Sequence, residues 1–278
     1  MKKINRRSFL AAAGLTAAAL ALTACGGSAS STASSTASSA ASSEAASTSA
    51  AAELTTVEAG KLTMATNAAF PPYEMTTDAG EFEGIDIDTA KAIAEKLGLE
   101  LQIDDMDFDA ALLSVQQGKA DIAMAGVTVT DERKAVMDFS DSYATGIQSI
   151  IVPEGSDITS PDDLAGKKIG TQRGTTGYIY CSDDFGDDAV VAYDDGLTAV
   201  QALNNGQVDA VVIDNAPAKE FVAANPGLVI LDTSYAEEDY AIGLAKGSAL
   251  EDAVNAALEE LKADGTLQAI VDKYIKAE

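Results

Sequence analysis

The sequence predicts an α/β protein that has two lobes of similar topology with mostly parallel sheets. From about Lys61 onward, short apolar runs alternate with amphipathic helical patterns, which is typical of strands and helices that alternate around a parallel sheet. The chain of 278 residues, 47% of them hydrophobic, is long enough to bury two moderate cores. One helix-and-strand pattern also occurs twice, which places one copy in each lobe.

Individual elements follow from the apolar periodicity and from the residues that end helices. A proline and an acidic residue after Ser160 predict a short capped helix that ends at Gly166. Glycine at position 98 ends another predicted helix, and Gly265 with Thr266 separates the last two. The predicted strands are 62–66 and 99–103, and the predicted long helices are 87–97, 250–263 and 267–276.

The repeated pattern covers residues 111–126 and 199–214. Each copy contains a helix, a glycine that ends it, an aspartate and an apolar strand. In open α/β sheets, ligands bind beyond the carboxyl ends of the strands. We therefore expect Gly126 and Asp214, which end the two copies, to face one cleft.

The first 24 residues have the pattern of a secretion signal: four basic residues among the first seven, an uncharged Ala/Leu run, and small residues before Cys25. Residues 22–25 resemble a lipobox, which predicts that Cys25 is lipidated; an ordinary cleaved signal is the alternative. Residues 6–10 resemble a twin-arginine signal, so the choice between this export route and the Sec route stays open.

Residues 25–59 are expected to form a flexible tether behind the lipid anchor. Between Gly26 and Ala52 the sequence is almost entirely Ser, Ala, Thr and Gly with one charge, at Glu44, and such a composition is too poor in apolar bulk to fold. The predicted location is therefore the outer face of the cytoplasmic membrane, on the cell surface or in the periplasm.

The composition excludes several classes of function. With 44 acidic and 18 basic side chains, the net charge of −26 opposes binding to nucleic acid. The absence of histidine excludes Ser-His-Asp and Cys-His relays and the imidazole ligands of zinc. Residues 105–109 begin like a calcium loop, but Ala110 and Gln116 replace the glycine and glutamate that this loop requires. We therefore expect neither a metal nor a cofactor.

Two charged residues are candidates for ligand binding. Arg133 follows a predicted strand end, and its planar guanidinium suits a bidentate contact with a carboxylate. The alternative is a surface salt bridge with Asp131 or Glu132. Asp214 ends an apolar strand, where a buried carboxylate needs a partner such as an ammonium group. Its alternative role is to cap the segment that begins at Asn215.

Phe70 and Phe108 are candidates for contacts with a ligand side chain. Each is expected in a loop near a strand, next to polar residues. Two aromatic faces could enclose a ligand side chain between them, whereas core packing is the alternative.

Five segments together carry a family resemblance. They are 66–74 (TNAAFPPYE), 84–88 (GIDID), 106–109 (MDFD), 125–133 (AGVTVTDER) and 138–140 (DFS). In this order and spacing they resemble the polar amino-acid-binding proteins of ABC importers. The resemblance extends from about Lys61 to the C-terminus.

The resemblance implies a type II periplasmic-binding-protein fold with a two-strand hinge. Lobe 1 would comprise 60–144 plus 242–278, and lobe 2 would comprise 145–241 with hinge segments at both ends. By position, the α-carboxylate of an amino acid would be held by Arg133, Thr128 and the backbone of Gly126 and Thr176. Asp214 would hold the α-ammonium, with the Gly126 carbonyl as a further acceptor. Around the ligand side chain, the resemblance places Phe70, Phe108, Asn67 and Gln172.

The function implied is that of an extracytoplasmic solute-binding protein. It would capture a free, polar amino acid between the lobes and, as a monomer without enzymatic activity, deliver it to a membrane permease. Asn67 stands where family members that bind cationic ligands often have an acid, which disfavours lysine and arginine. Two alternatives stay open: a dehydratase on the same fold, and an amino-acid sensor for a membrane receptor. The orientation of Arg173 is also open.

Overall fold

The structure, a computed structural model, describes residues 54–276. The predicted signal peptide, the lipidation site at Cys25 and the tether up to residue 53 lie outside the described residues. Within 54–276, none of the helices combines the length and the apolar character needed to cross a membrane.

The first lobe is built on a five-stranded sheet with the order β5-β1-β6-β14-β7. Strand β1 pairs in parallel with β5 and β6, as the alternation of elements predicted, whereas β14 pairs antiparallel with β6 and β7. Strand β14 follows the return of the chain from the second lobe, and it runs opposite to the strands β6 and β7 that precede the crossing. The strands are β1 (Lys61–Thr66), β5 (Glu100–Asp105), β6 (Ile122–Ala123), β7 (Met137–Phe139) and β14 (Gly243–Ala245).

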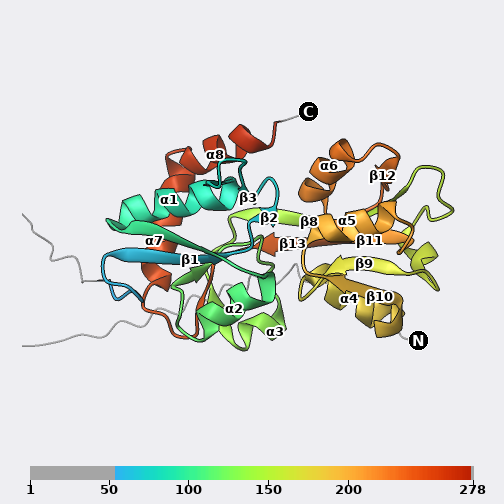
Figure 1. Ribbon diagram of the computed structural model, residues 1–278. Helices are drawn as coiled ribbons and strands as arrows, with labels where there is room; N and C mark the ends of the chain where they lie inside the picture. The colour runs from blue at the N-terminus through green and yellow to red at the C-terminus, as the bar shows by residue number, and fades with distance from the viewer. Residues whose placement is uncertain (1–53, 277–278) are drawn as a thin grey trace, which may run out of the picture. The chain divides into compact units, whose positions relative to one another are not determined.

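Helices lie on both sides of this sheet, with α1 and α8 on one side of β1 and α2 on the other (Figure 1). The apolar faces of α1 and α7 pack in one core with the buried residues of β1. The helices are α1 (Ile85–Leu97), α2 (Phe108–Gln116), α3 (Asp131–Lys134), α7 (Glu251–Ala263) and α8 (Thr266–Tyr274). Next to them, a small antiparallel sheet contains β2 (Ala69–Phe70), β3 (Glu74–Thr76) and β4 (Phe82–Glu83).

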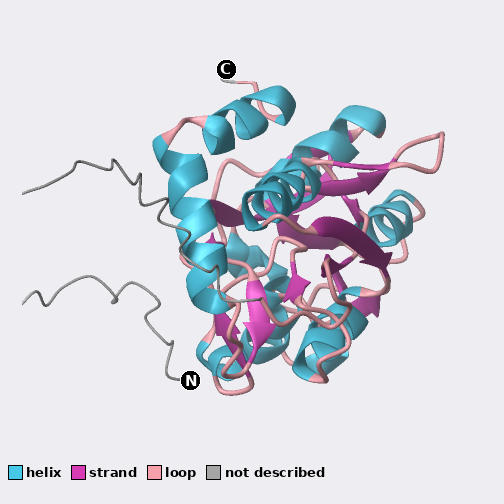
Figure 2. Ribbon diagram, turned by 90° about the vertical axis from the view of Figure 1, so that its left-hand side faces the viewer, coloured by secondary structure: helices cyan, strands magenta, loops and turns pink. Residues whose placement is uncertain are grey.

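The second lobe has a sheet with the order β10-β9-β11-β8-β12, in which β13 also pairs with β8. Strands β9, β10 and β11 are parallel, and the partners of β8 are antiparallel to it. The ribbon in Figure 2 shows helices around both sheets. The strands are β8 (Ala144–Pro153), β9 (Ile169–Gln172), β10 (Val190–Tyr193), β11 (Ala210–Asp214), β12 (Leu228–Ile230) and β13 (Ala236–Tyr240); the helices are α4 (Thr176–Phe185), α5 (Gly196–Asn204) and α6 (Asn215–Ala224), with 3-10 turns at η1 (Pro161–Leu164) and η2 (Asp187–Ala189).

Strands β8 and β13 carry the chain out of the first lobe and back into it. All of β13 pairs antiparallel with the first half of β8, from Ala144 opposite Tyr240 to Gln148 opposite Ala236. Gly146 lies in this pair, and a Cβ at this position would overlap the Tyr240 ring. The absence of a side chain at position 146 therefore leaves room for the fully buried ring of Tyr240 against the paired strand β8.

Most elements predicted from sequence are confirmed. Helix α1 ends at Gly98, which adopts the left-handed conformation, and the segment after Ser160 is a 3-10 turn with the predicted capping box. The last helix ends at Tyr274, two residues earlier than expected, and α1 begins at Ile85, two residues earlier than expected.

The sequence repeat is also a structural repeat. Gly118 and Gly206 end α2 and α5 with φ angles of 65° and 67°. Asp121 then accepts a hydrogen bond of 2.8 Å from the Thr63 N–H, and Asp209 one of 2.7 Å from the Lys168 N–H. In both lobes, the aspartate thus ties the start of one parallel strand to its neighbour.

The two aspartates differ in burial, which allows a matched test. Asp121 is 6% exposed and also accepts a bond of 2.8 Å from the Val57 N–H, whereas Asp209 is exposed. We expect Asp121→Ala to lower the free energy of unfolding by about 2–3 kcal/mol, because it leaves two N–H groups without an acceptor. Asp209→Ala should cost less than about 1 kcal/mol, since water replaces the carboxylate. Urea unfolding of both variants measures this, and equal losses would contradict it.

Candidate functional site

A pocket lies where loops of the first lobe meet the ends of β9 and β11 in the second. It contains about 320 Å³ of atom-free space, part of it open to solvent. All nine residues named from sequence line it: Asn67, Phe70, Phe108, Gly126, Thr128, Arg133, Gln172, Thr176 and Asp214. The lining also includes Glu74, Ala125 and Thr175, which the sequence analysis did not single out.

Arg133 enters the pocket from α3, a short helix whose N-cap residue Thr130 accepts a hydrogen bond from the Arg133 N–H. The side chain is 8% exposed. Its guanidinium donates to the Thr128 carbonyl at 2.7 Å and to the Gly174 carbonyl at 3.1 Å, and it lies 5.3 Å from the centroid of the Phe108 ring. The alternative of a surface salt bridge with a neighbouring acid is therefore wrong.

Burial lowers the pKa of Arg133, and the negative charge of Glu238 opposes this shift. An arginine stays protonated in proteins, so the pocket contains a permanent cation. Its two carbonyl partners carry no formal charge, which leaves this cation able to pair with a bound anion.

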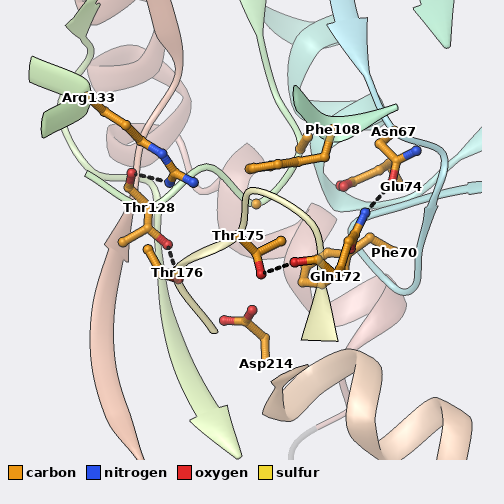
Figure 3. A pocket seen from close by; sticks show the side chains of 12 residues that line it. Asn67, Phe70, Glu74, Phe108, Thr128, Arg133, Gln172, Thr175, Thr176 and Asp214 are labelled. Carbon is orange, nitrogen blue, oxygen red and sulfur yellow. Dashed lines mark hydrogen bonds between the residues drawn. The ribbon is translucent and has the colours of Figure 1, made fainter. Parts of the chain in front are cut away.

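Asp214 ends β11 and lies in the same pocket on a different side from Arg133 (Figure 3). One carboxylate oxygen accepts a bond of 2.8 Å from Gln148 Nε2, and the other accepts a bond from the Tyr240 hydroxyl. Asp214 is the N-cap residue of α6, as the alternative expected, but its side chain makes no capping bond and faces the pocket. Burial, together with the charge of Glu238, raises the pKa of Asp214 to about 7.

The hydroxyls of Thr128 and Thr176 share one hydrogen-bond acceptor on β13, one of the two strands that connect the lobes. Glu238 of β13 accepts hydrogen bonds from the hydroxyl of Thr128 at 3.1 Å, the hydroxyl of Thr176 at 2.9 Å and Gln148 Nε2 at 3.1 Å. Thr128 belongs to the first lobe and Thr176 begins α4 of the second. The hydroxyls of both lobes are therefore oriented by one buried carboxylate.

Asn67 and Gln172 bond directly to each other across the pocket. Gln172 Nε2 donates to Asn67 Oδ1 at 2.8 Å (Figure 3). Asn67 Nδ2 donates to the Met106 carbonyl at 2.9 Å. Both side chains are buried. Both polar atoms of Asn67 and the Nε2 of Gln172 are thus engaged within the protein, and the pair joins the two lobes at this edge of the pocket.

The two phenylalanines lie in regular elements and not in the loops expected from sequence. Phe70 belongs to β2, and Phe108 is the first residue of α2. Both are buried, both line the pocket, and each also packs in a hydrophobic core. Core packing and contact with the pocket are therefore not exclusive alternatives.

The backbone N–H of Gly126 donates to Asp86 at 2.9 Å. Asp86 is buried at the start of α1 and also accepts a bond of 2.7 Å from the Tyr143 hydroxyl. The N–H of Gly126 is therefore engaged, and only its carbonyl is left for a ligand. Burial raises the pKa of Asp86 to about 6, an effect that these donors oppose.

Arg173 does not belong to the pocket. Its side chain is 56% exposed, donates to the Ala192 carbonyl at 3.4 Å and lies 3.8 Å from a carboxylate oxygen of Asp194. The orientation that the sequence left open is thus toward solvent. Of the two arginines in the described chain, only Arg133 faces the pocket.

Glu74 is the functional candidate that sequence reasoning missed. It lies on β3, lines the pocket and is fully buried. The segment that contains it, TNAAFPPYE, was used for the family resemblance, but nothing in its pattern indicates that the final acid turns inward. Burial and the charge of Asp86 raise the pKa of Glu74 well above its ordinary value. Among residues 54–276, no three His, Cys, Asp or Glu side chains are grouped so that they could hold a metal ion.

Comparison with known proteins finds relatives over the described length. The family model for bacterial extracellular solute-binding proteins, family 3, matches residues 62–277. A probable histidine-binding protein of Neisseria gonorrhoeae is 32% identical over 99% of this chain and 98% of its own. The solved arginine-, lysine-, histidine-binding protein ArtJ of Geobacillus stearothermophilus is 34% identical with a TM-score of 0.75, and the match covers 78% of this chain and 96% of that one.

An ancestral arginine-binding protein bound to arginine is 43% identical with a TM-score of 0.74, over 78% of this chain and 98% of that one. These matches confirm the type II periplasmic-binding-protein fold that the resemblance implied.

The raised pKa values of Asp214, about 7, and Asp86, about 6, predict how stability depends on pH. Both exceed the ordinary value of 3.8, so between about pH 4 and 7 the folded protein binds protons that the unfolded chain has lost. The free energy of unfolding of the ligand-free protein should therefore increase as the pH falls from 8 to 5. Urea unfolding across this range measures it, and Asp214→Asn should reduce the increase. A stability that falls over this range would contradict the prediction.

Proposed function

We propose that this chain, which belongs to family 3 of the bacterial extracellular solute-binding proteins, is the amino-acid-binding protein of an ABC importer. It binds a free, polar amino acid in the described pocket and delivers it to the importer's membrane permease. The observation that carries this proposal is the placement of one buried cation, Arg133, and one buried acid, Asp214, on different sides of the same pocket.

A free amino acid presents a carboxylate and an ammonium group on one carbon. Arg133 offers a guanidinium to the carboxylate, and the backbone N–H of Thr176, at the start of α4, is a further donor. Asp214 offers a carboxylate to the ammonium, and the Gly126 carbonyl is a second acceptor. The ligand side chain then extends between Phe70 and Phe108 toward Asn67 and Gln172.

Ligand binding and closure of the lobes are expected to be coupled. Arg133 and Asp214 belong to different lobes, so a ligand that pairs with both is bound fully only when the lobes are together. The direct bonds from Gln172 to Asn67 and from Arg133 to Gly174 exist in the same arrangement. The contacts of the ligand with both lobes would therefore stabilise the closed arrangement in addition to these direct bonds between the lobes.

The remaining parts of the proposal concern the location of the protein. We propose that Cys25 is lipidated and that the tether holds a monomeric binding protein at the outer face of the cytoplasmic membrane. We also propose that it has no enzymatic activity, because the relatives compared are binding proteins and the chain contains no histidine.

Binding of the amino acids to the folded protein, residues 54–278, tests the proposal, and Arg133→Ala tests its central contact. Titration calorimetry with the twenty amino acids should find a ligand, and the variant should lose at least about a hundredfold in affinity for it, because the ligand carboxylate stays buried without its partner. Arg173→Ala is the matched control and should bind normally. Near-wild-type affinity of Arg133→Ala, with an unchanged unfolding midpoint, would disprove this assignment.

Closure can be tested at Gly174, where the lobes approach closely. A Cβ at this glycine would overlap the Asp109 carboxylate of the other lobe. Gly174→Leu should therefore weaken ligand binding about tenfold or more, equivalent to about 1.4 kcal/mol. Gly155→Leu is the control, because Gly155 has a similar φ of 79° against 73° but no atom near its Cβ position. Equal affinities of the two variants in calorimetry would show that closure does not depend on this contact.

A further inference from the structure

Glu238 is a buried acid on β13 that the sequence analysis did not single out. Its side chain is 7% exposed, and it is not among the residues that line the pocket. One carboxylate oxygen, Oε2, accepts hydrogen bonds from the hydroxyls of Thr128 and Thr176 and from Gln148 Nε2, at distances of 2.9 to 3.1 Å. The other oxygen, Oε1, is buried without a hydrogen-bond partner among the described residues. The bonds thus converge on a single oxygen.

The two threonines that share this oxygen come from different lobes. Thr128 lies in the segment 127–129 of the first lobe, which two backbone hydrogen bonds of 3.0 and 3.1 Å join to residues 239–241, next to Glu238. Thr176 begins α4 of the second lobe. Their hydroxyl oxygens lie 3.5 Å apart (Figure 3). Glu238 is therefore held beside the first lobe by the backbone, and its side chain reaches the second.

The hydroxyl protons of both threonines are used within the protein. A threonine hydroxyl has one proton to donate, and both protons are directed to Glu238 Oε2. Neither hydroxyl therefore has a proton left for the carboxylate of a bound amino acid. The hydroxyls join the lobes to each other through Glu238, and Arg133 and backbone N–H groups are left to hold the ligand carboxylate.

This junction depends on the arrangement of the lobes. Thr128 and Thr176 can both donate to one oxygen only while they lie side by side, so movement of one lobe away from the other breaks at least one bond. Hydrogen bonds to a carboxylate are among the stronger ones in proteins, and a buried hydroxyl that loses its acceptor is costly. Contacts that exist in only one arrangement shift the equilibrium toward that arrangement.

We propose that Glu238 is a positioning residue that couples the lobes: by accepting a hydroxyl of each lobe at one oxygen, it stabilises the closed arrangement in which an amino acid is bound. This inference rests on the proposed function of the pocket. Gln148 Nε2, the third donor to Glu238, also donates to Asp214 at 2.8 Å. The junction is thereby connected to the acid that is proposed to hold the ligand ammonium.

Two substitutions at this position separate the hydrogen bonds from the bulk of the fold. Glu238→Ala removes the shared acceptor. Glu238→Gln is the conservative variant, because its amide oxygen can take the place of Oε2, and its amide nitrogen takes the place of Oε1, which has no bond to lose. Glu237→Ala is the matched control, since Glu237 is the preceding acid of the same strand and is exposed.

Closure is measured by small-angle X-ray scattering on protein that has been freed of bound amino acids by unfolding and refolding. The probe is an equimolar mixture of the twenty protein amino acids, and the readout is the concentration that produces half of the decrease in the radius of gyration. We expect Glu238→Ala to raise this concentration at least about tenfold, and Glu238→Gln to stay within about threefold of the wild type. Glu237→Ala should match the wild type.

Thr176→Val tests the same junction from the second lobe. Valine keeps the shape of the side chain and the backbone N–H but lacks the hydroxyl. The variant should raise the half-closure concentration about fivefold in the wild-type background and have little effect in the Glu238→Ala background, because the bond is then already lost. Equal effects in both backgrounds would contradict a shared junction.

The outcomes distinguish this inference from the proposed function. A wild type that closes with the mixture, and a Glu238→Ala variant that closes at the same concentration, would overturn the inference and leave the proposed function intact. Equal losses in Glu238→Ala and Glu238→Gln would also overturn it. Failure of the wild type to close with any amino acid would overturn both. If urea unfolding shows that Glu238→Ala is not folded, Glu238→Gln and Thr176→Val decide the matter: a half-closure concentration of Thr176→Val equal to that of the wild type would overturn the inference.

Discussion

The antiparallel pairing of β8 with β13 is the constraint on which the site depends. These two strands carry the chain between the lobes, and their side chains hydrogen-bond to residues that line the pocket: Gln148 from β8, and Glu238 and Tyr240 from β13. Through them, Asp214, Thr128 and Thr176 are oriented by one hydrogen-bonded group. The register of the β8–β13 pair thus fixes the relative positions of Thr128, Thr176 and Asp214, which lie far apart in the sequence.

Burial of this network explains its electrostatics. In a pocket with little water, carboxyl groups keep their protons unless donors or cations lie close to them, and here the acids outnumber the cations. Asp86 and Asp214 each accept hydrogen bonds from neutral donors, which stabilise their ionised forms and partly oppose the rise in pKa caused by burial. Glu74 instead lies against the Asp86 carboxylate, a contact that is a hydrogen bond when Glu74 carries its proton.

The internal repeat places equivalent residues of the two lobes at one pocket. The same helix, glycine, aspartate and strand place Gly126 in one lobe and Asp214 in the other, and the two residues line one pocket. The lobes meet there through side-chain bonds such as Gln172 to Asn67 and through the guanidinium of Arg133 on Gly174. A ligand that completes these contacts would bias the lobes toward closure without a new interface.

The sequence by itself determined the α/β class, the repeat and the bounds of several helices and strands, because apolar periodicity and glycine stops are local signals. The family resemblance, carried by the order and spacing of five segments, supplied most of the residues that gather in the pocket. Only the tertiary structure decided which alternatives were right. It buried Arg133 against two carbonyls, turned Arg173 to solvent, engaged the Gly126 N–H with Asp86 and buried Glu74 beside the same aspartate. These outcomes depend on burial and on contacts between residues distant in the sequence, and neither is encoded in a local pattern.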